Sequence, residues 1–166
     1  MAGTSTDFKL LAAQVEALAS ERTHWVTLLA NISALLAQEL KDVNWVGFYL
    51  RGSYVDASLP ADDLVLGPFQ GRVACTRIPW GKGVCGTAAQ RNRTMRIDDV
   101  HSFVGHIACD AASASEVVVP LRVEGRVVGV LDIDSPVPAR FGKADQTGLE
   151  LIAGIVEVAL QNSPTA

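Results

Sequence analysis

The chain has 166 residues and a mass of 17.6 kDa, and 49% of its residues are hydrophobic, which is enough apolar material for the core of one compact domain. The net charge is −4 at pH 7, and no basic tract is longer than a pair, which argues against a nucleic-acid partner. No apolar run approaches membrane-spanning length and no secretory leader is visible, so we expect a cytoplasmic protein without a membrane partner.

The first 50 residues predict two helices followed by a strand. Apolar side chains recur at helical spacing in residues 7–40, with a polar interruption at 19–22. Residues 45–50 are aromatic and β-branched, which favours a strand, and the turn at 51–53 directs the chain toward a second strand at 64–66. We therefore expect a β-hairpin after the helices.

The middle of the chain is expected to be less regular. Residues 72–78 predict a strand, and a glycine-rich loop at 81–86 leads into a short helix at 87–91 and a strand at 95–97. From 98 to 115 the residues are small and polar with no sustained period, which predicts a long loop. Such a loop inside a compact domain usually serves function.

A hairpin and a closing helix complete the pattern. Residues 116–123 and 126–134 form two strands around a tight turn, and 143–161 has an apolar helical face. The second strand is apolar on both faces, so it should be central in the sheet, and Asp132 and Asp134 should share one face at its end. This order of elements predicts an α+β layer architecture with antiparallel strands.

The three cysteines are an odd number for a protein expected in a reducing compartment. They could be buried small residues, metal ligands or redox thiols. Cys109 falls in the long loop, where we expect exposure. Cys85 precedes the predicted helix start, where free backbone amides would stabilise a thiolate, and Cys75 falls in a predicted strand, where a core position is more usual.

Two other kinds of site compete with the redox interpretation. A zinc site could draw on the cysteines with His101 and His106, but the spacing contains no Cys-x-x-Cys pair. The run 81–86 matches Gly-x-Gly-x-x-Gly, the dinucleotide fingerprint, without the βαβ context that this motif requires. A tight loop that needs positive φ is the favoured interpretation of these glycines.

Three carboxylates stand at strand edges beside apolar runs, namely Glu116, Asp132 and Asp134. Such a cluster suits a ligand with an ammonium group, and crowding would raise the pKa of one carboxyl so that it could donate a proton. Trp45 is expected either in the core or in a pocket wall.

Seven blocks of the sequence resemble the GAF-domain free methionine-(R)-sulfoxide reductases. They cover most of residues 44–142 and read Asn44-Trp45-Val46-Gly47-Phe48-Tyr49, Leu66-Gly67-Pro68-Phe69-Gln70-Gly71, Ala74-Cys75, Gly83-Val84-Cys85-Gly86-Thr87-Ala88, His106-Ile107-Ala108-Cys109-Asp110, Ser115-Glu116-Val117-Val118-Val119-Pro120 and Gly129-Val130-Leu131-Asp132-Ile133-Asp134-Ser135.

The resemblance implies one GAF domain over residues 1–166. Its helices at about 7–40 and its closing helix at about 143–161 would pack on one face of a central antiparallel sheet. A ligand pocket covered by a loop would occupy the other face, and the sheet and pocket together would span about 43–135.

The resemblance also implies a role for each thiol. Cys109 would be catalytic, and Cys75 and Cys85 would be the two resolving positions. In this scheme the Cys109 thiolate attacks the sulfoxide, becomes a sulfenic acid, and is then attacked by a second cysteine to give a disulfide.

The remaining site residues follow from the same resemblance. Glu116, Asp132 and Asp134 would bind and polarise free methionine sulfoxide, with Glu116 or Asp134 as the proton donor, and Trp45 would line the pocket for the substrate's methyl group. Thioredoxin or an equivalent dithiol would recycle the disulfide, no cofactor or metal would be needed, and the protein would be a homodimer. The alternative is a GAF sensor that binds a small molecule, such as a cyclic nucleotide, and uses its cysteines only structurally.

Overall fold

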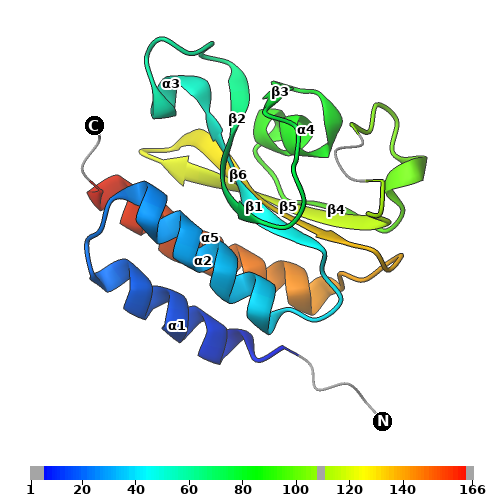
Figure 1. The fold of residues 1–166 in the computed structure, drawn as a ribbon, viewed down its shortest axis with the longest axis horizontal. Coiled ribbons are helices and arrows are strands. Elements are labelled where there is room, and N and C mark those ends of the chain that lie inside the picture. The colour runs from blue at the N-terminus through cyan, green and yellow to red at the C-terminus, as the bar shows by residue number, and fades with distance from the viewer. Residues whose placement is uncertain (1–5, 108–110, 164–166) are drawn as a thin grey trace.

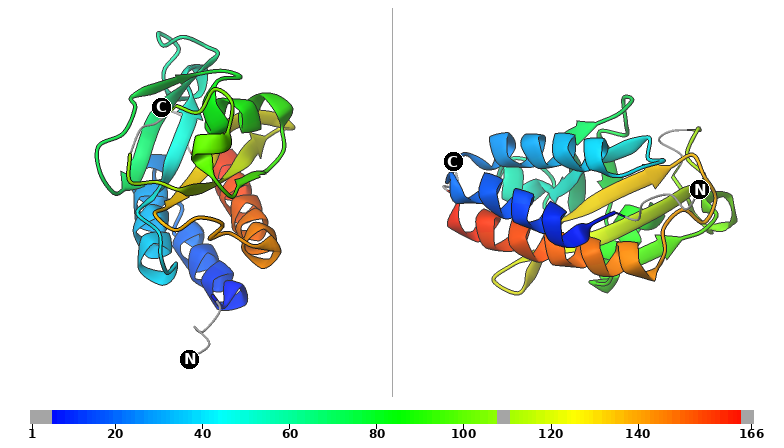
Figure 2. Two further views of the ribbon diagram at one scale, coloured as in Figure 1. Left: turned by 90° about the vertical axis from the view of Figure 1, so that its right-hand side faces the viewer. Right: turned by 90° about the horizontal axis from the view of Figure 1, so that it is seen from below.

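The computed structural model describes residues 6–107 and 111–163, and in these ranges it forms a six-stranded antiparallel sheet with helices on both faces (Figures 1 and 2). The strand order is β3-β2-β1-β6-β5-β4. The strands are β1 (Trp45–Arg51), β2 (Asp63–Gln70), β3 (Arg77–Pro79), β4 (Met95–Ile97), β5 (Ser115–Val123) and β6 (Arg126–Ser135). The predicted antiparallel α+β architecture is confirmed.

Three helices cover one face of the sheet, as Figure 1 shows. They are α1 (Phe8–Ser20), α2 (Trp25–Glu39) and α5 (Lys143–Asn162). Helices α2 and α5 contact the strands directly, and α1 packs against both of these helices. Asp7 begins α1 by accepting hydrogen bonds from the amides of Lys9 and Leu10, which satisfies donors that the first helical turn leaves free.

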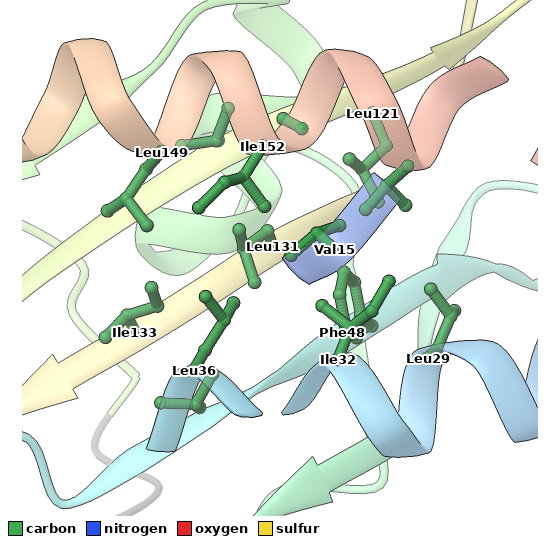
Figure 3. Packing of buried hydrophobic residues seen from close by; sticks show 14 of the residues in the cluster. Val15, Leu29, Ile32, Leu36, Phe48, Leu121, Leu131, Ile133, Leu149 and Ile152 are labelled. Carbon is green, nitrogen blue, oxygen red and sulfur yellow. The ribbon is translucent and has the colours of Figure 1, made fainter. Parts of the chain in front are cut away.

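The main core lies between these helices and the sheet (Figure 3). Leu29, Ile32 and Leu36 of α2 meet side chains from the central strands, and Leu149 and Ile152 of α5 close the layer. All five residues are completely buried, so the centre of this face of the sheet is closely packed.

The second face of the sheet carries α4 (Gly83–Arg91), the 3₁₀ turn η1 (Val100–Ser102) and irregular chain. A smaller hydrophobic cluster lies there, built from β1, β5 and β6 on one side and α4 on the other. The remaining helix, α3 (Gly52–Val55), makes the connection from β1 toward β2. No helix in the described ranges is both long and apolar enough to cross a membrane.

The predicted strand at 72–78 is only partly correct, because β3 is limited to Arg77–Pro79. The pairing of β2 with β3 runs from Asp63 to Val65, and one more hydrogen bond joins the amide of Leu66 to the carbonyl of Thr76. Two residues later β2 contains Pro68, which has no amide hydrogen to continue the ladder. Cys75 therefore lies in irregular chain that crosses the pocket face, and the prediction of a strand position for it is wrong.

The hairpin of β5 and β6 matches its prediction closely. Its turn places Glu124 at φ 51° and Gly125 at φ 76°, which is the left-handed pair that a two-residue hairpin needs. Strand β6 pairs with β1 on one side and with β5 on the other, so its predicted central position is confirmed.

Candidate active site

The register of three strands places the carboxylates side by side on the second face. Asp134 of β6 pairs with Trp45 of β1 and with Glu116 of β5, which makes one row across the sheet. Asp132 stands two residues earlier on the same face of β6. The predicted shared face of Asp132 and Asp134 is confirmed, and Glu116 joins them through pairing that the sequence alone does not reveal.

Helix α4 adds a thiol to these carboxylates. This helix begins at Gly83, four residues before the predicted start, so Cys85 lies inside its first turn. The Cys85 Sγ is 3.9 Å from Oε1 of Glu116. Sulfur and carboxylate oxygens of Cys85, Glu116 and Asp132 all lie within 4.8 Å of one another, and all three residues are buried. Among the described residues, these three side chains could together hold a metal ion.

Burial and mutual repulsion control the charges of this cluster. Burial, together with the charges of Asp132 and Asp134, raises the pKa of Glu116 well above its ordinary value. Burial also raises the pKa of Asp132, to about 6. Because the upward shift is larger at Glu116, we assign the proton to Glu116 and the negative charge to Asp132 at neutral pH.

The charge on Asp132 is incompletely compensated within the described chain. Asp132 is only 6% exposed. Its Oδ1 atom is buried and has no hydrogen-bond partner among residues 6–107 and 111–163. A buried carboxylate oxygen without a donor is costly, and such groups often face a ligand. The cavity on this face is lined by Asp132 together with Glu116, Asp134 and Cys85.

We expect Asp132→Asn to stabilise the fold at neutral pH. A rise in the Asp132 pKa from 3.8 to about 6 means that the ionised form opposes folding by up to roughly 3 kcal/mol above pH 6. This cost disappears below about pH 4, where the carboxyl is protonated in both the folded and the unfolded state. The free energy of unfolding of the variant should therefore exceed that of the wild type at pH 7, with a melting temperature several degrees higher, and the two proteins should converge near pH 4.

Urea unfolding of both proteins at pH 4 and pH 7 measures this difference. Asp98→Asn is the matched control, because Asp98 is exposed and removing its charge relieves no burial. A variant that is less stable than the wild type at pH 7 would contradict the assignment of a buried, ionised Asp132.

The structure contradicts the expected thiolate at Cys85. Cys85 lies in the first turn of α4, but the residue is only 3% exposed and its sulfur is 3.9 Å from a carboxyl oxygen of Glu116. Burial, and then the charges of Asp132 and Glu116, raise the pKa of the Cys85 thiol well above its ordinary value. Cys85 is thus held as a neutral thiol in this form of the site.

Aromatic side chains of β1 form one wall of the cavity. Trp45 stacks on Phe69 and on Tyr49, with ring centroids 5.2 and 5.9 Å apart, and its Nε1 donates to the carbonyl of Arg72. The two interpretations of Trp45 are both correct, because this residue is buried in the second hydrophobic cluster and also lines the pocket.

The irregular chain that carries Cys75 is held against this wall. The Tyr49 hydroxyl donates to the Cys75 carbonyl over 2.9 Å. Cys75 is disulfide-bonded, whereas Cys85 is a free thiol. Cys109, the predicted attacking residue, lies outside the described residues.

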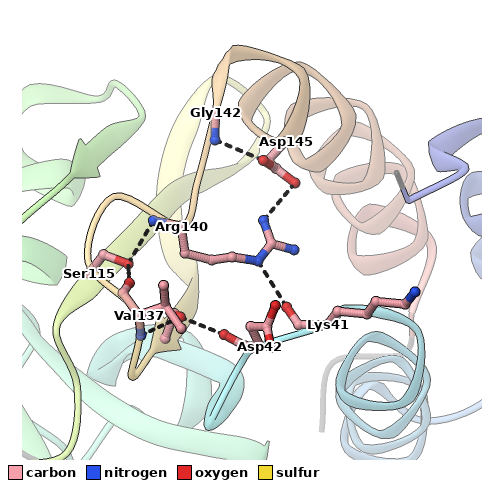
Figure 4. A network of polar contacts seen from close by, with 8 residues as sticks. Lys41, Asp42, Ser115, Val137, Arg140, Gly142 and Asp145 are labelled. Atoms are coloured by element: carbon pink, nitrogen blue, oxygen red, sulfur yellow. Dashed lines mark hydrogen bonds and ion pairs between the residues drawn. The ribbon is translucent and has the colours of Figure 1, made fainter. Parts of the chain in front are cut away.

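A polar network holds the ends of β5 and β6, next to Glu116 and Asp134 (Figure 4). The Arg140 side chain binds Asp145 of α5 and the Lys41 carbonyl, while its backbone amide donates to the Ser115 hydroxyl. Ser135 in turn donates to the carbonyl of Asp42. These contacts tie the two strand ends to α5 and to the chain entering β1, which limits the movement of the neighbouring carboxylates.

The glycines at 81–86, which form the turn into α4 and its first residues, are shaped by packing and not by a nucleotide. Gly83 has φ 60°, and a Cβ atom on Gly86 would lie 2.5 Å from the carbonyl oxygen of Pro79. The described sheet is antiparallel throughout, so the βαβ context of the dinucleotide fingerprint is missing there. The expected positive φ is confirmed for Gly81 and Gly83, whereas Gly86 lies within α4.

Comparison with known proteins shows the family to which this fold belongs. The family model of the GAF domain matches residues 24–160. The free methionine-R-sulfoxide reductase of Escherichia coli is 54% identical over 144 residues, which cover 87% of this chain and 82% of that protein.

Solved structures give the same result. The fRMsr of Staphylococcus aureus in complex with substrate superimposes with a TM-score of 0.86 at 46% identity, covering 96% of this chain and 99% of that one. The free methionine-R-sulfoxide reductase of Neisseria meningitidis in complex with its substrate gives a TM-score of 0.86 at 44% identity, with 94% and 89% covered. The chain belongs to the GAF-domain free methionine-R-sulfoxide reductases.

The GAF fold collects most of the predicted site residues on one face of the sheet. Five of them line the same cavity, namely Trp45, Cys85, Glu116, Asp132 and Asp134. Cys75 is linked to this cavity through the Tyr49 hydroxyl.

Tyr49 and Ser113 are among the residues of this GAF pocket that sequence reasoning missed. Tyr49 lies four residues after Trp45 on β1, and the strand period of two already places both on one face. Ser113 lines the cavity from the long loop, and no signal in the sequence distinguishes it from other small polar residues there.

Proposed function

We propose that this protein reduces free L-methionine-(R)-sulfoxide to methionine. The observation that carries the proposal is the buried acidic cluster. In it, Oδ1 of Asp132 has no hydrogen-bond partner among the described residues, and Glu116 is assigned the proton. Both residues line the same cavity as the aromatic side chains of β1. An α-ammonium group satisfies Asp132, a carboxylic acid can donate to a sulfoxide oxygen, and Trp45 offers apolar surface for a methyl group. The substrate-bound relatives from Staphylococcus aureus and Neisseria meningitidis support the same choice.

In the proposed reaction the Cys109 thiolate attacks the sulfoxide sulfur while Glu116, assisted by Asp134, donates a hydrogen bond to the oxygen. The oxygen atom ends on Cys109 as a sulfenic acid, and methionine leaves with its sulfur reduced by two electrons. A second thiol then attacks the sulfenic acid, which forms a disulfide and releases water. A dithiol protein such as thioredoxin exchanges with this disulfide and restores both thiols, with no metal or organic cofactor.

Cys75 is the resolving residue in this scheme. Its sulfur already forms a disulfide, while Cys85 is a free thiol beside Glu116. A buried neutral thiol is a poor nucleophile toward a sulfenic acid. We assign Cys85 to the wall of the acidic pocket and the catalytic disulfide to Cys75 and Cys109.

The alternative, a GAF sensor for a cyclic nucleotide, fits the pocket less well. A cyclic nucleotide carries an anionic phosphodiester, and none of the described cavity-lining residues is Lys or Arg. His106 is the lining residue able to become cationic, and burial lowers its pKa, which favours the neutral ring. The negative charge assigned to Asp132 in this cluster would also repel an anion.

A single turnover of the reduced protein tests the function and the resolving step together. With excess substrate and no added reductant, one equivalent of methionine should form from the R epimer and essentially none from the S epimer. Peptide mapping should then find Cys75 joined to Cys109 in the wild type and in Cys85→Ser, whereas Cys75→Ser should accumulate the sulfenic acid, which dimedone traps.

Either of two results would contradict this scheme. A disulfide that contains Cys85 in the wild type would overturn the assignment of Cys75. Equal yields of methionine from the two epimers would overturn the proposed substrate. We further propose that the 166-residue chain is a single GAF domain that works in the cytoplasm as a homodimer.

A further inference from the structure

We propose that Cys85, Glu116 and Asp132 form an inhibitory binding site for a soft divalent cation, with Zn²⁺ as the best match. The inference concerns metal binding by the resting protein and does not depend on the identity of the sulfoxide substrate. It starts from the composition of the cluster, because one sulfur and two carboxylate oxygens are ligand types that zinc accepts together.

The geometry brings the three ligand atoms close to zinc-binding positions. They lie within 4.8 Å of one another, whereas ligand atoms around a tetrahedral zinc ion are separated by about 3.3 to 3.8 Å given the usual bond lengths. A contraction of at most about 1.5 Å between any two of these atoms closes the site. The ligands come from α4, β5 and β6, so side-chain rotation can supply the contraction without unfolding an element.

A second observation points to a cation independently of the ligand types. Oδ1 of Asp132 is buried, lines the cavity and has no hydrogen-bond partner among the described residues. A divalent cation would provide this oxygen with a partner and would neutralise the acidic cluster, which carries no described Lys or Arg in its cavity. On binding, the Cys85 thiol would lose its proton to solvent and become a thiolate ligand.

The fourth coordination position would face the cavity. His106 offers an additional donor, because its Nε2 is 3.9 Å from Oε2 of Glu116. Zinc is commonly held by three protein ligands, with a fourth position left for water or, here, for the His106 imidazole. A metal held there would occupy the carboxylates that the proposed substrate needs, so zinc and substrate would exclude each other.

Titration with Co²⁺, a spectroscopic substitute for Zn²⁺, tests the site directly. The full chain is used with its Cys75 disulfide formed, and a thiol assay verifies one free sulfur per chain. One equivalent of Co²⁺ should produce a thiolate-to-cobalt charge-transfer band together with the visible bands of tetrahedral cobalt, and Zn²⁺ should displace it. Cys85→Ala should remove the charge-transfer band, and Asp132→Asn should weaken binding at least about tenfold.

His101→Gln is the matched control, since His101 is exposed and outside the cluster, and its titration should follow that of the wild type. The proposal is overturned if the wild type shows no charge-transfer band at one equivalent, or if the band survives in Cys85→Ala. Should Cys85→Ala fail to fold, Asp132→Asn still decides the question, because we expect that variant to be more stable than the wild type, and unchanged affinity there would overturn the site. No sulfoxide is present, so these outcomes are separate from the test of the reductase function.

Discussion

Replacing Cys109 by serine is expected to abolish the reduction of free methionine sulfoxide, with a loss of at least about a thousandfold in kcat/KM. A serine hydroxyl fits the same space, but it is far too basic to supply an anionic nucleophile at neutral pH, and oxygen cannot take the place of sulfur in the sulfenic acid that must follow. In the proposed reaction, Cys109 is the side chain that makes covalent bonds with the sulfur and oxygen atoms of the substrate. We therefore expect its removal to have the largest effect of any single substitution.

Steady-state assays with a thioredoxin system and NADPH measure the loss, and calorimetric titration with substrate provides the control. Cys109→Ser should still bind the free sulfoxide, because Asp132, Glu116 and Trp45 are unchanged in it. Activity within about tenfold of the wild type would remove Cys109 from the proposed role.

The second large effect that we expect is a preference for the free amino acid over blocked methionine sulfoxide. An N-acetylated, amidated substrate has no α-ammonium group, so its entry would leave the Asp132 carboxylate buried without a partner. Stranding a buried charge in this way costs about 2 to 5 kcal/mol, which corresponds to a loss in kcat/KM on the order of 30-fold to several thousandfold.

Comparison of free and blocked R sulfoxide under identical conditions measures this preference. Asp132→Asn should raise KM for the free substrate more than it lowers kcat, because Asp132 binds the ammonium group throughout the reaction. Glu116→Gln should mainly lower kcat, because polarisation of the sulfoxide oxygen matters most in the transition state. Equal kcat/KM values for free and blocked substrates would refute the assignment of free methionine sulfoxide, even if the thiol chemistry holds.

The expected stability of Asp132→Asn connects these results. The carboxylate that we expect to recognise the ammonium group is the one whose ionised form opposes folding, since it is buried and incompletely paired. A substitution that weakens binding should therefore strengthen the fold. Such an exchange of stability for activity is common where a site holds unsatisfied charge ready for a ligand.

The local elements of this protein could be predicted from sequence wherever a period persisted for several residues. The amphipathic faces of α1, α2 and α5 and the hairpin of β5 and β6 have patterns that depend only on neighbouring residues. The shared face of Asp132 and Asp134 also follows from the strand period alone. The short strand β3 was overestimated, because its length depends on the partner strand, in which Pro68 ends the ladder.

The grouping of the site depended on tertiary structure, because its members come from separate elements. Only strand register places Glu116 beside Asp134, and only the packing of α4 on the sheet places the Cys85 thiol within 3.9 Å of Glu116. The sequence around Cys85 indicated a helix start and hence an activated thiolate. In the folded chain, burial among carboxylates raises the pKa of that thiol, because long-range electrostatics and desolvation outweigh what the local motif supplies.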